Sequence, residues 1–224
     1  MLETRIQELK QMLISEAGLV EKMVSLSVDG LYKNIPSLLE NVLALEDQVN
    51  QTELEIDDKC ITTIALYQPE ARDLRLILMI YRINNDLERL ADQAVNISES
   101  TAHLMDNPVV YELPELEQMK SNTLTMLKNS LDALVKEDVA LSHQVCSEDN
   151  TVDSLNRQIY HHLVELIQAN PILTSQYLHL LRIAKNLERI ADLSTNIADN
   201  QSKNEHYMAI SQRLLQVAAQ ALVD

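Results

Sequence analysis

Carboxylate side chains spaced four residues apart are the feature of this sequence with the clearest chemical meaning. Two acidic residues at this spacing lie on one face of a helix, with their Cβ atoms about 6 Å apart. The chain has four such pairs, which are Glu53/Asp57, Glu88/Asp92, Asp149/Asp153 and Glu188/Asp192. Roughly five pairs would occur by chance in a random order of these residues, so the number of pairs alone indicates no function.

The placement of the pairs is informative, because the second half of the chain repeats the first. The segment Leu87–Asp92 (LERLAD) recurs 100 residues later as Leu187–Asp192 (LERIAD). A weaker match relates Val49–Asp57 to Val145–Asp153 at an offset of 96 residues. All four carboxylate pairs fall within these segments, two in each half, so they belong to an internal duplication.

Long helices are the elements that must position these carboxylates. Only 2 Gly and 5 Pro occur among 224 residues, and the 7 aromatic residues are all Tyr. A sandwich or barrel needs turns about every 8–12 residues and a higher β propensity, so the composition favours an all-α fold. The breakers predict helices at about 3–33, 37–68, 69–106, 115–135, 138–169 and 171–201, followed by an amphipathic segment at 207–223.

The predicted organisation is two three-helix units, residues 1–106 and 115–224, joined by a linker at 107–114. Ser37 and Glu40 have the spacing of a capping box, which predicts that the Ser37 hydroxyl caps the second helix. The polar stretch 202–205 is expected to separate the sixth helix from the last segment.

Antiparallel packing would bring the pairs to a similar level within each half. In the second half the pair centres are symmetric about the turn at Pro171, whereas in the first half they are offset by roughly 5–10 Å along the axis. Four close carboxylates cannot all stay ionised without a counter-charge. Hard cations such as Mg²⁺, Mn²⁺, Ca²⁺ or iron prefer such oxygen ligands. The alternative is that every pair lies on a solvated helix face.

Composition restricts the partners and the compartment. The 34 acidic and 18 basic residues give a net charge of −16, which disfavours nucleic acids and anionic lipid and favours cations or basic protein surfaces.

The longest apolar run, Leu76–Tyr81, is much shorter than the roughly 20 residues of a membrane span. We expect no signal peptide. Cys60 and Cys146 are expected to be small core residues in a reducing cytoplasm rather than a disulfide.

Two enzyme classes lack their motifs in this sequence. A carboxylate-bridged di-iron bundle needs Glu-x-x-His on two helices, and none of the 6 His has an acidic residue three positions before it. A nucleophile elbow needs a strand–turn–helix context, which an all-α chain does not offer. Arg89 and Arg189, repeated beside the acidic residues, either hold the carboxylates, bind a partner or form exposed ion pairs. We therefore expect a protein that is not an enzyme.

The segments Leu87–Glu99 (LERLADQAVNISE) and Leu187–Asp199 (LERIADLSTNIAD) resemble the paired signatures of the PhoU family of phosphate-uptake regulators. The resemblance extends over nearly the whole chain. It implies two three-helix bundles related by a pseudo-twofold, often assembled as a homodimer. It also implies multinuclear metal sites, with iron the first expectation and Mg, Mn, Ca, Zn or Ni as alternatives. The implied ligands are Glu53, Asp57, Glu88, Asp92, Asp149, Asp153, Glu188, Asp192, Asn196 and Asp199.

The sequence departs from the family pattern at one point in each repeat. The Gly-Asp-His that is common in the family is Ala91-Asp92-Gln93 in the first repeat and Ala191-Asp192-Leu193 in the second. Loss of the glycine limits how closely another backbone can approach, and loss of the histidine removes a pH-sensitive group. These changes bear on the metal and the partner surface rather than on the fold.

The resemblance implies a regulatory role. A PhoU-like protein would act in the cytoplasm, peripherally at the inner membrane, through contact with the ATPase of a phosphate ABC transporter and with a phosphate-sensing histidine kinase. No nucleic acid and no membrane insertion are expected. A regulator of a sodium–phosphate cotransporter and a metal-free helical adaptor are the alternatives.

Overall fold

The computed structural model describes residues 1–33, 35–107 and 113–221, and the side chains of residues 1–30, 35–107 and 113–203. Within these residues the chain folds into long helices without a strand, so the predicted all-α fold is confirmed. The helices are α1 (Leu2–Lys33), α2 (Pro36–Tyr67), α3 (Ala71–Asp106), α4 (Pro114–Lys136), α5 (Val139–Ala169) and α6 (Thr174–Ala221), with a short 3₁₀ helix, η1 (Pro171–Leu173), before α6.

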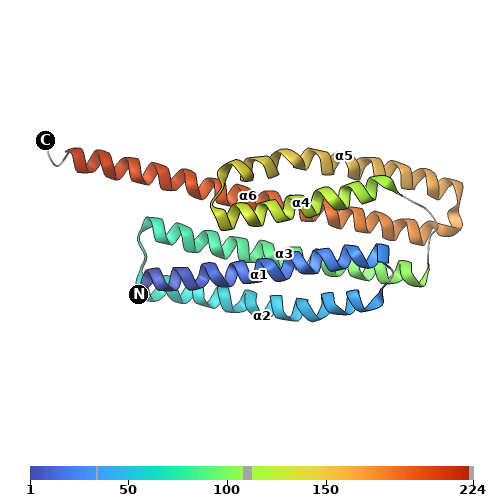
Figure 1. Ribbon diagram of the computed structural model, residues 1–224, viewed down its shortest axis with the longest axis horizontal. Helices are drawn as coiled ribbons and strands as arrows, with labels where there is room; N and C mark the ends of the chain where they lie inside the picture. The colour runs from blue at the N-terminus through green and yellow to red at the C-terminus, as the bar shows by residue number, and fades with distance from the viewer. Residues whose placement is uncertain (34, 108–112, 222–224) are drawn as a thin grey trace.

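The helices form two three-helix bundles that lie side by side (Figure 1). Helices α1, α2 and α3 pack against one another in the first bundle, and α4, α5 and α6 do so in the second. The bundles are joined mainly where α3 packs along α6, with a smaller contact between α1 and α4. This arrangement leaves α2 and α5 on the outside of the molecule.

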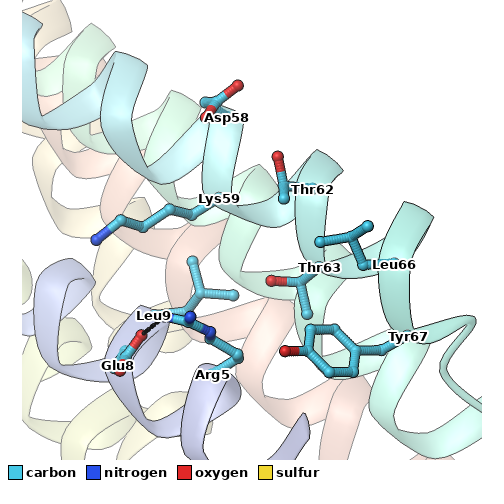
Figure 2. Close-up of a pocket in the computed structure, with 9 residues that line it drawn as sticks. All are labelled: Arg5, Glu8, Leu9, Asp58, Lys59, Thr62, Thr63, Leu66 and Tyr67. Atoms are coloured by element: carbon cyan, nitrogen blue, oxygen red, sulfur yellow. Dashed lines mark hydrogen bonds and ion pairs between the residues drawn. The ribbon is translucent and has the colours of Figure 1, made fainter. Parts of the chain in front are cut away.

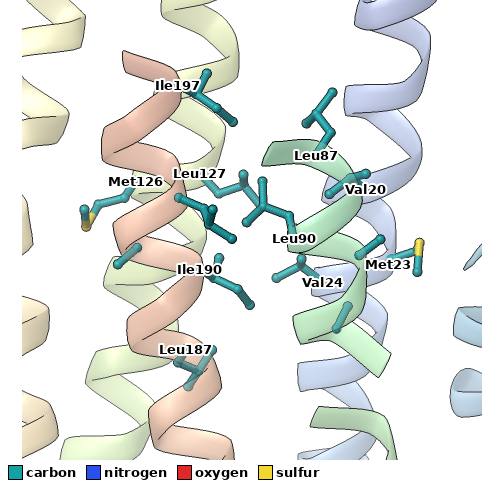
Figure 3. Close-up of a cluster of buried hydrophobic side chains, with 14 of the residues drawn as sticks. Val20, Met23, Val24, Leu87, Leu90, Met126, Leu127, Leu187, Ile190 and Ile197 are labelled. Carbon is teal, nitrogen blue, oxygen red and sulfur yellow. The ribbon is translucent and has the colours of Figure 1, made fainter. Parts of the chain in front are cut away.

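A continuous apolar core fills both bundles and the space between them. Figure 3 shows α1 and α3 facing α4 and α6, with Leu90 of α3 directed toward Leu127 of α4 and with Ile190 of α6 beside them. All three side chains are fully buried. Because α3 contacts both its own bundle and α6, it is apolar over more than one face.

Two predicted helix boundaries are wrong for identifiable reasons. The capping box at Ser37 does not form, because Pro36 occupies the first turn and Ile35 is the N-cap residue, without a side-chain hydrogen bond. Proline suits this position because its missing N–H would have no partner there. The predicted end near Gln201 is also absent, since α6 continues to Ala221 and extends beyond the other helices in Figure 1. The polar stretch 202–205 has no glycine or proline to end it.

The helix ends reverse the chain with little help from glycine. Gln68 and Glu137 are left-handed C-cap residues, with φ of 43° and 55°, after α2 and α4. At the start of α5 the carboxylate of Asp138 accepts a hydrogen bond from the Leu141 N–H at 3.0 Å. Part of the predicted linker 107–114 lies outside the described residues, and the proposed domain limits stay predictions. No helix in the described part of the chain is apolar enough over its length to cross a membrane.

Candidate metal centre

In the first bundle, the two predicted carboxylate pairs face the α2–α3 contact. Glu53, Asp57 and Glu88 are half-buried, whereas Asp92 is exposed. Burial, Asp92 and Glu53 all raise the pKa of Glu88, while Arg89 lowers it. Burial and Asp57 raise the pKa of Glu53. Glu88 on α3 therefore interacts electrostatically with Glu53 on α2, across the contact between the two helices.

A buried amide fixes one of these carboxylates. Asn84, fully buried on α3, donates through Nδ2 to the backbone carbonyl of Glu53 at 3.0 Å and to Oδ1 of Asp57 at 3.2 Å. A buried polar side chain bonded in this way restrains the rotamer of its partner. Asn84 is not among the residues predicted from the sequence, although its position one helical turn before Glu88 could have indicated it.

In the second bundle, the carboxylates of Asp149 and Asp153 on α5 lie near those of Glu188 and Asp192 on α6. Burial is the largest cause that raises the pKa of Asp149, followed by Asp192, Asp153 and Glu188. Burial, Glu188 and Asp153 raise the pKa of Asp192, while Lys185 and Arg189 lower it. Glu188 also forms an ion pair with Lys185. All four predicted residues therefore interact electrostatically.

Asn196 and Asp199 lie farther along α6 and are exposed. Asp199 pairs with Lys203, and its charge contributes to the raised pKa of Cys146 on α5. Their counterparts in the first bundle are used differently. Asn96 Oδ1 and Glu99 Oε2 both accept hydrogen bonds from Nη2 of Arg182 on α6, at 2.6 and 2.8 Å. In the first half this part of the motif therefore joins the two bundles.

Glu16 carries a carboxylate that is not among the site residues predicted from the sequence. Its side chain on α1 is fully buried, and neither carboxylate oxygen has a hydrogen-bond partner among the described residues. Burial, as the largest cause, and the charges of Glu53, Asp57 and Glu88 together raise its pKa to about 8. The signal in the sequence was an acidic residue on the otherwise apolar face that carries Leu13.

The carboxylates of each bundle interact electrostatically, but they do not form a complete coordination sphere for a metal ion. Among the described side chains, no group of three or more His, Cys, Asp or Glu lies close enough to hold one ion as placed. Ligation would therefore require rotation of the carboxylate side chains toward a common point. A bound cation would relieve the repulsion that, after burial, raises the pKa of Glu53, Glu88, Asp149 and Asp192. Oxygen donors suit a hard cation. The ten residues predicted as ligands stay a prediction.

Two other features lack the chemistry of this site. Figure 2 shows a pocket between α1 and α2 in which Arg5 pairs with Glu8 at 2.7 Å. The Lys59 amine there contacts Sδ of Met12 at 3.3 Å.

Both cysteines are free. Burial and Asp57 raise the pKa of the buried Cys60 thiol to about 12, which disfavours a thiolate ligand.

Comparison with known proteins identifies the family. The model of the PhoU domain matches residues 13–101 and 116–201, one segment in each bundle. The phosphate-specific transport system accessory protein PhoU homolog of Aquifex aeolicus is 34% identical over 184 residues, covering 82% of this chain and 83% of that protein. The homolog of Pseudomonas aeruginosa is 32% identical over 197 residues, covering 87% and 81%.

Solved structures agree with the sequence comparison. The crystal structure of PhoU from Pseudomonas aeruginosa superimposes with a TM-score of 0.89 at 30% identity, covering 92% of this chain and 99% of that one. The phosphate transport system regulatory protein PhoU from Streptococcus pneumoniae, 23% identical with a TM-score of 0.83, has the same fold. The predicted resemblance is confirmed, and the chain belongs to the PhoU family.

Proposed function

We propose that this chain is an accessory regulator of a phosphate-specific transport system. The observation that carries the proposal is the match of both repeats to relatives that bear this name, over more than four-fifths of either chain. Those relatives are named as accessory proteins, so the role proposed is regulation rather than catalysis. The protein would act at the cytoplasmic side of the membrane through contact with other proteins.

The partners proposed are the ATPase of a phosphate ABC transporter and a phosphate-sensing histidine kinase. The net charge of −16 supports docking to basic protein surfaces, because opposite potentials speed association and select partners. Affinity capture from the native host, grown with ample and with limiting phosphate, tests this assignment. We expect the transporter ATPase to be captured in a phosphate-dependent manner. Capture of a sodium–phosphate cotransporter instead would identify the alternative system, and absence of any phosphate-transport or phosphate-sensing protein would contradict the proposal.

We also propose that the carboxylate clusters bind metal, with iron as the first candidate. The duplicated acidic pairs and the raised pKa values of Glu53, Glu88, Asp149 and Asp192 support this, because a cation is the simplest counter-charge for such a cluster. Elemental analysis of protein purified without chelator tests it. The double variant Asp92→Asn/Asp192→Asn should lose most of the bound metal.

A charge-matched control distinguishes the clusters from the acidic surface in general. Glu55→Gln/Glu165→Gln removes the same number of charges from exposed positions outside the four pairs and should retain the metal. Absence of metal from the wild-type protein, or equal loss in both double variants, would favour the metal-free adaptor. We propose a homodimer as well, on the family resemblance, and light scattering would measure its mass.

A further inference from the structure

An apolar stripe on α2 faces away from the first bundle. The side chains of Leu43, Leu54 and Ile61 are 51%, 67% and 59% exposed. At about 100° per residue, their positions fall within roughly 20° of one another around the helix. Helix α2 packs against α1 and α3 with its other side and lies on the outside of the molecule (Figure 1). Large apolar side chains are therefore left uncovered along one line of this helix.

Carboxylates lie between these apolar side chains. Glu40, Asp47 and Asp58 are exposed and belong to the same side of the helix. None of the three forms an ion pair with another residue that the structure describes. We define the outer face of α2 by six residues, in which acidic and apolar side chains alternate: Glu40, Leu43, Asp47, Leu54, Asp58 and Ile61.

The second bundle offers an internal comparison for this face. The offset of 96 residues that relates the carboxylate pairs also relates α2 to α5. Val49 and Val145 are both fully buried, and so are Ile56 and Val152, which supports this alignment. Helix α5 also lies on the outside of the molecule. The two helices therefore occupy equivalent places in the two bundles.

The equivalent side of α5 has neither the apolar nor the acidic character. The counterparts of Leu43, Leu54 and Ile61 are Val139, Asn150 and Arg157. The counterparts of Glu40, Asp47 and Asp58 are Lys136, His143 and Ser154. Asn150 and Arg157 are exposed, and Val139 is half-buried. An outer helix of this fold thus forms without exposed leucine or isoleucine at these places, so packing of the bundle does not explain the outer face of α2.

The charge of the outer face indicates what covers it. Exposed apolar side chains that are grouped together and flanked by polar ones are typical of interaction sites. Two copies of this face would set carboxylates against one another, and the net charge of −16 opposes such an association further. A surface on which Lys or Arg alternates with apolar side chains matches both features. Because the face is a stripe at helical spacing, its complement is the side of another helix.

We propose that the outer face of α2 docks a basic amphipathic helix of the transporter ATPase. The inference rests on the partner proposed above and adds the surface by which this chain meets it. Leu54 and Ile61 would be covered by apolar side chains of the partner helix, while Asp47 and Asp58 would pair with its Lys or Arg residues. The outer side of α5 would take no part in this contact.

Calorimetric titration of the full chain with the purified ATPase of the host's phosphate ABC transporter tests the inference. Leu54→Asn/Ile61→Arg copies the residues of α5, removing apolar contacts and placing a positive charge before a basic helix. We expect this variant to weaken binding by roughly tenfold or more. Asp47→Asn/Asp58→Asn keeps the shape of both side chains, and it should weaken binding by roughly threefold or more and reduce its dependence on salt.

A matched variant on α5 provides the control. Tyr160 is 51% exposed and Glu165 is exposed, so Tyr160→Gln/Glu165→Gln also removes one apolar and one acidic side chain from an outer helix. Its affinity for the ATPase should equal that of the wild type. Circular dichroism confirms the helical fold of each variant, and all the substituted side chains are exposed.

The possible failures are distinguishable. An ATPase that binds the wild type and both α2 variants equally, or that is weakened as much by the α5 control, would overturn the docking face and leave the proposed partner in place. An ATPase that does not bind the wild type would overturn the proposed partner together with the inference. If Leu54→Asn/Ile61→Arg instead halved the mass of the chain in light scattering without changing ATPase binding, the face would be an interface between two copies, which also contradicts the inference.

Discussion

At the scale of single residues, the proton on Glu16 makes stability depend on pH. Its pKa is about 8 in the folded chain, against an ordinary value of 4.5. Between these values the folded chain keeps a proton that the unfolded chain has released. The free energy of unfolding of the metal-free protein should therefore fall as pH rises from about 4.5 to about 8, by up to about 1.4 kcal/mol per pH unit from this group.

Urea unfolding of the chelator-treated protein between pH 5 and pH 8.5 checks this expectation. Glu16→Gln removes the titrating group, so the variant should gain stability over wild type as pH rises. The difference between the two proteins isolates Glu16 from the other titrating carboxylates. Parallel stability curves for the two proteins would show that the Glu16 carboxyl has no raised pKa.

The two cysteines should differ sharply in reactivity. Burial raises the pKa of both thiols, that of Cys60 to about 12, but Cys60 is only 1% exposed whereas Cys146 is exposed. Because the thiolate is the reactive form, a disulfide reagent at pH 8 should modify Cys146 and spare Cys60 in the folded chain. One thiol per chain should titrate in buffer and two in denaturant. Two thiols that react at similar rates in buffer would contradict the burial of Cys60.

Glu16 and the cysteines show which features the sequence pattern could predict and which it could not. The four-residue spacing of Glu88 and Asp92 places them on one face of α3. Antiparallel packing about the turn predicted that the two pairs of the first half would reach a similar level only approximately, with an offset along the helix axis. Glu16 has no acidic residue four positions before or after it, so the four-residue spacing could not reveal it. The prediction that both cysteines lie in the core is confirmed for Cys60 and wrong for Cys146.

At the scale of helices, a backbone conformation that favours glycine occurs at a residue with a side chain, whereas a glycine lies in the interior of a helix. Gln68 caps α2 with a positive φ, which is unfavourable for a residue with a side chain. Gly18 lies inside α1, is exposed, and a Cβ at that position would meet no atom within 4 Å. We expect Gln68→Gly and Gly18→Ala each to raise the free energy of unfolding by about 0.5–1 kcal/mol.

Replacement of Gln68 by alanine provides the control for the glycine substitution at this position. Gln68→Ala should give little gain, since alanine does not relieve the left-handed strain. Thermal and urea unfolding measure all three variants. A loss of stability in Gln68→Gly would show that the Gln68 side chain contributes more than its backbone conformation costs.

Helix limits were predicted well where proline or a sharp change of polarity marks them. Pro114 and Pro171 lie at or next to the starts of α4 and η1, as the breakers indicate. The polar stretch 202–205 failed as a boundary because polar residues are compatible with a helix that leaves the bundle, as α6 does in Figure 1. Polarity alone therefore does not end a helix.

At the scale of the whole molecule, the repeat predicted two bundles but not the faces by which they meet. The pairing of α3 with α6 depends on helices that are apolar on two sides, and a periodic pattern cannot say which side faces the other bundle. Arg182 crosses this boundary to Asn96 and Glu99, yet the side chains of Arg182 and Glu99 are 44% and 58% exposed. Exposed ion pairs contribute little to stability.

The association of the bundles should therefore depend on apolar packing far more than on this ion pair. Leu90 is fully buried and is directed toward Leu127 in Figure 3. Its replacement by alanine should lower the free energy of unfolding by about 2–5 kcal/mol. Arg182→Gln should cost less than about 1 kcal/mol, and that loss should shrink further in high salt. Urea unfolding of both variants at low and high salt measures the comparison. If Arg182→Gln proved the more damaging change, the two bundles would be held together by charge, and the acidic surface of the molecule would then influence how its halves fit as well as which partners it meets.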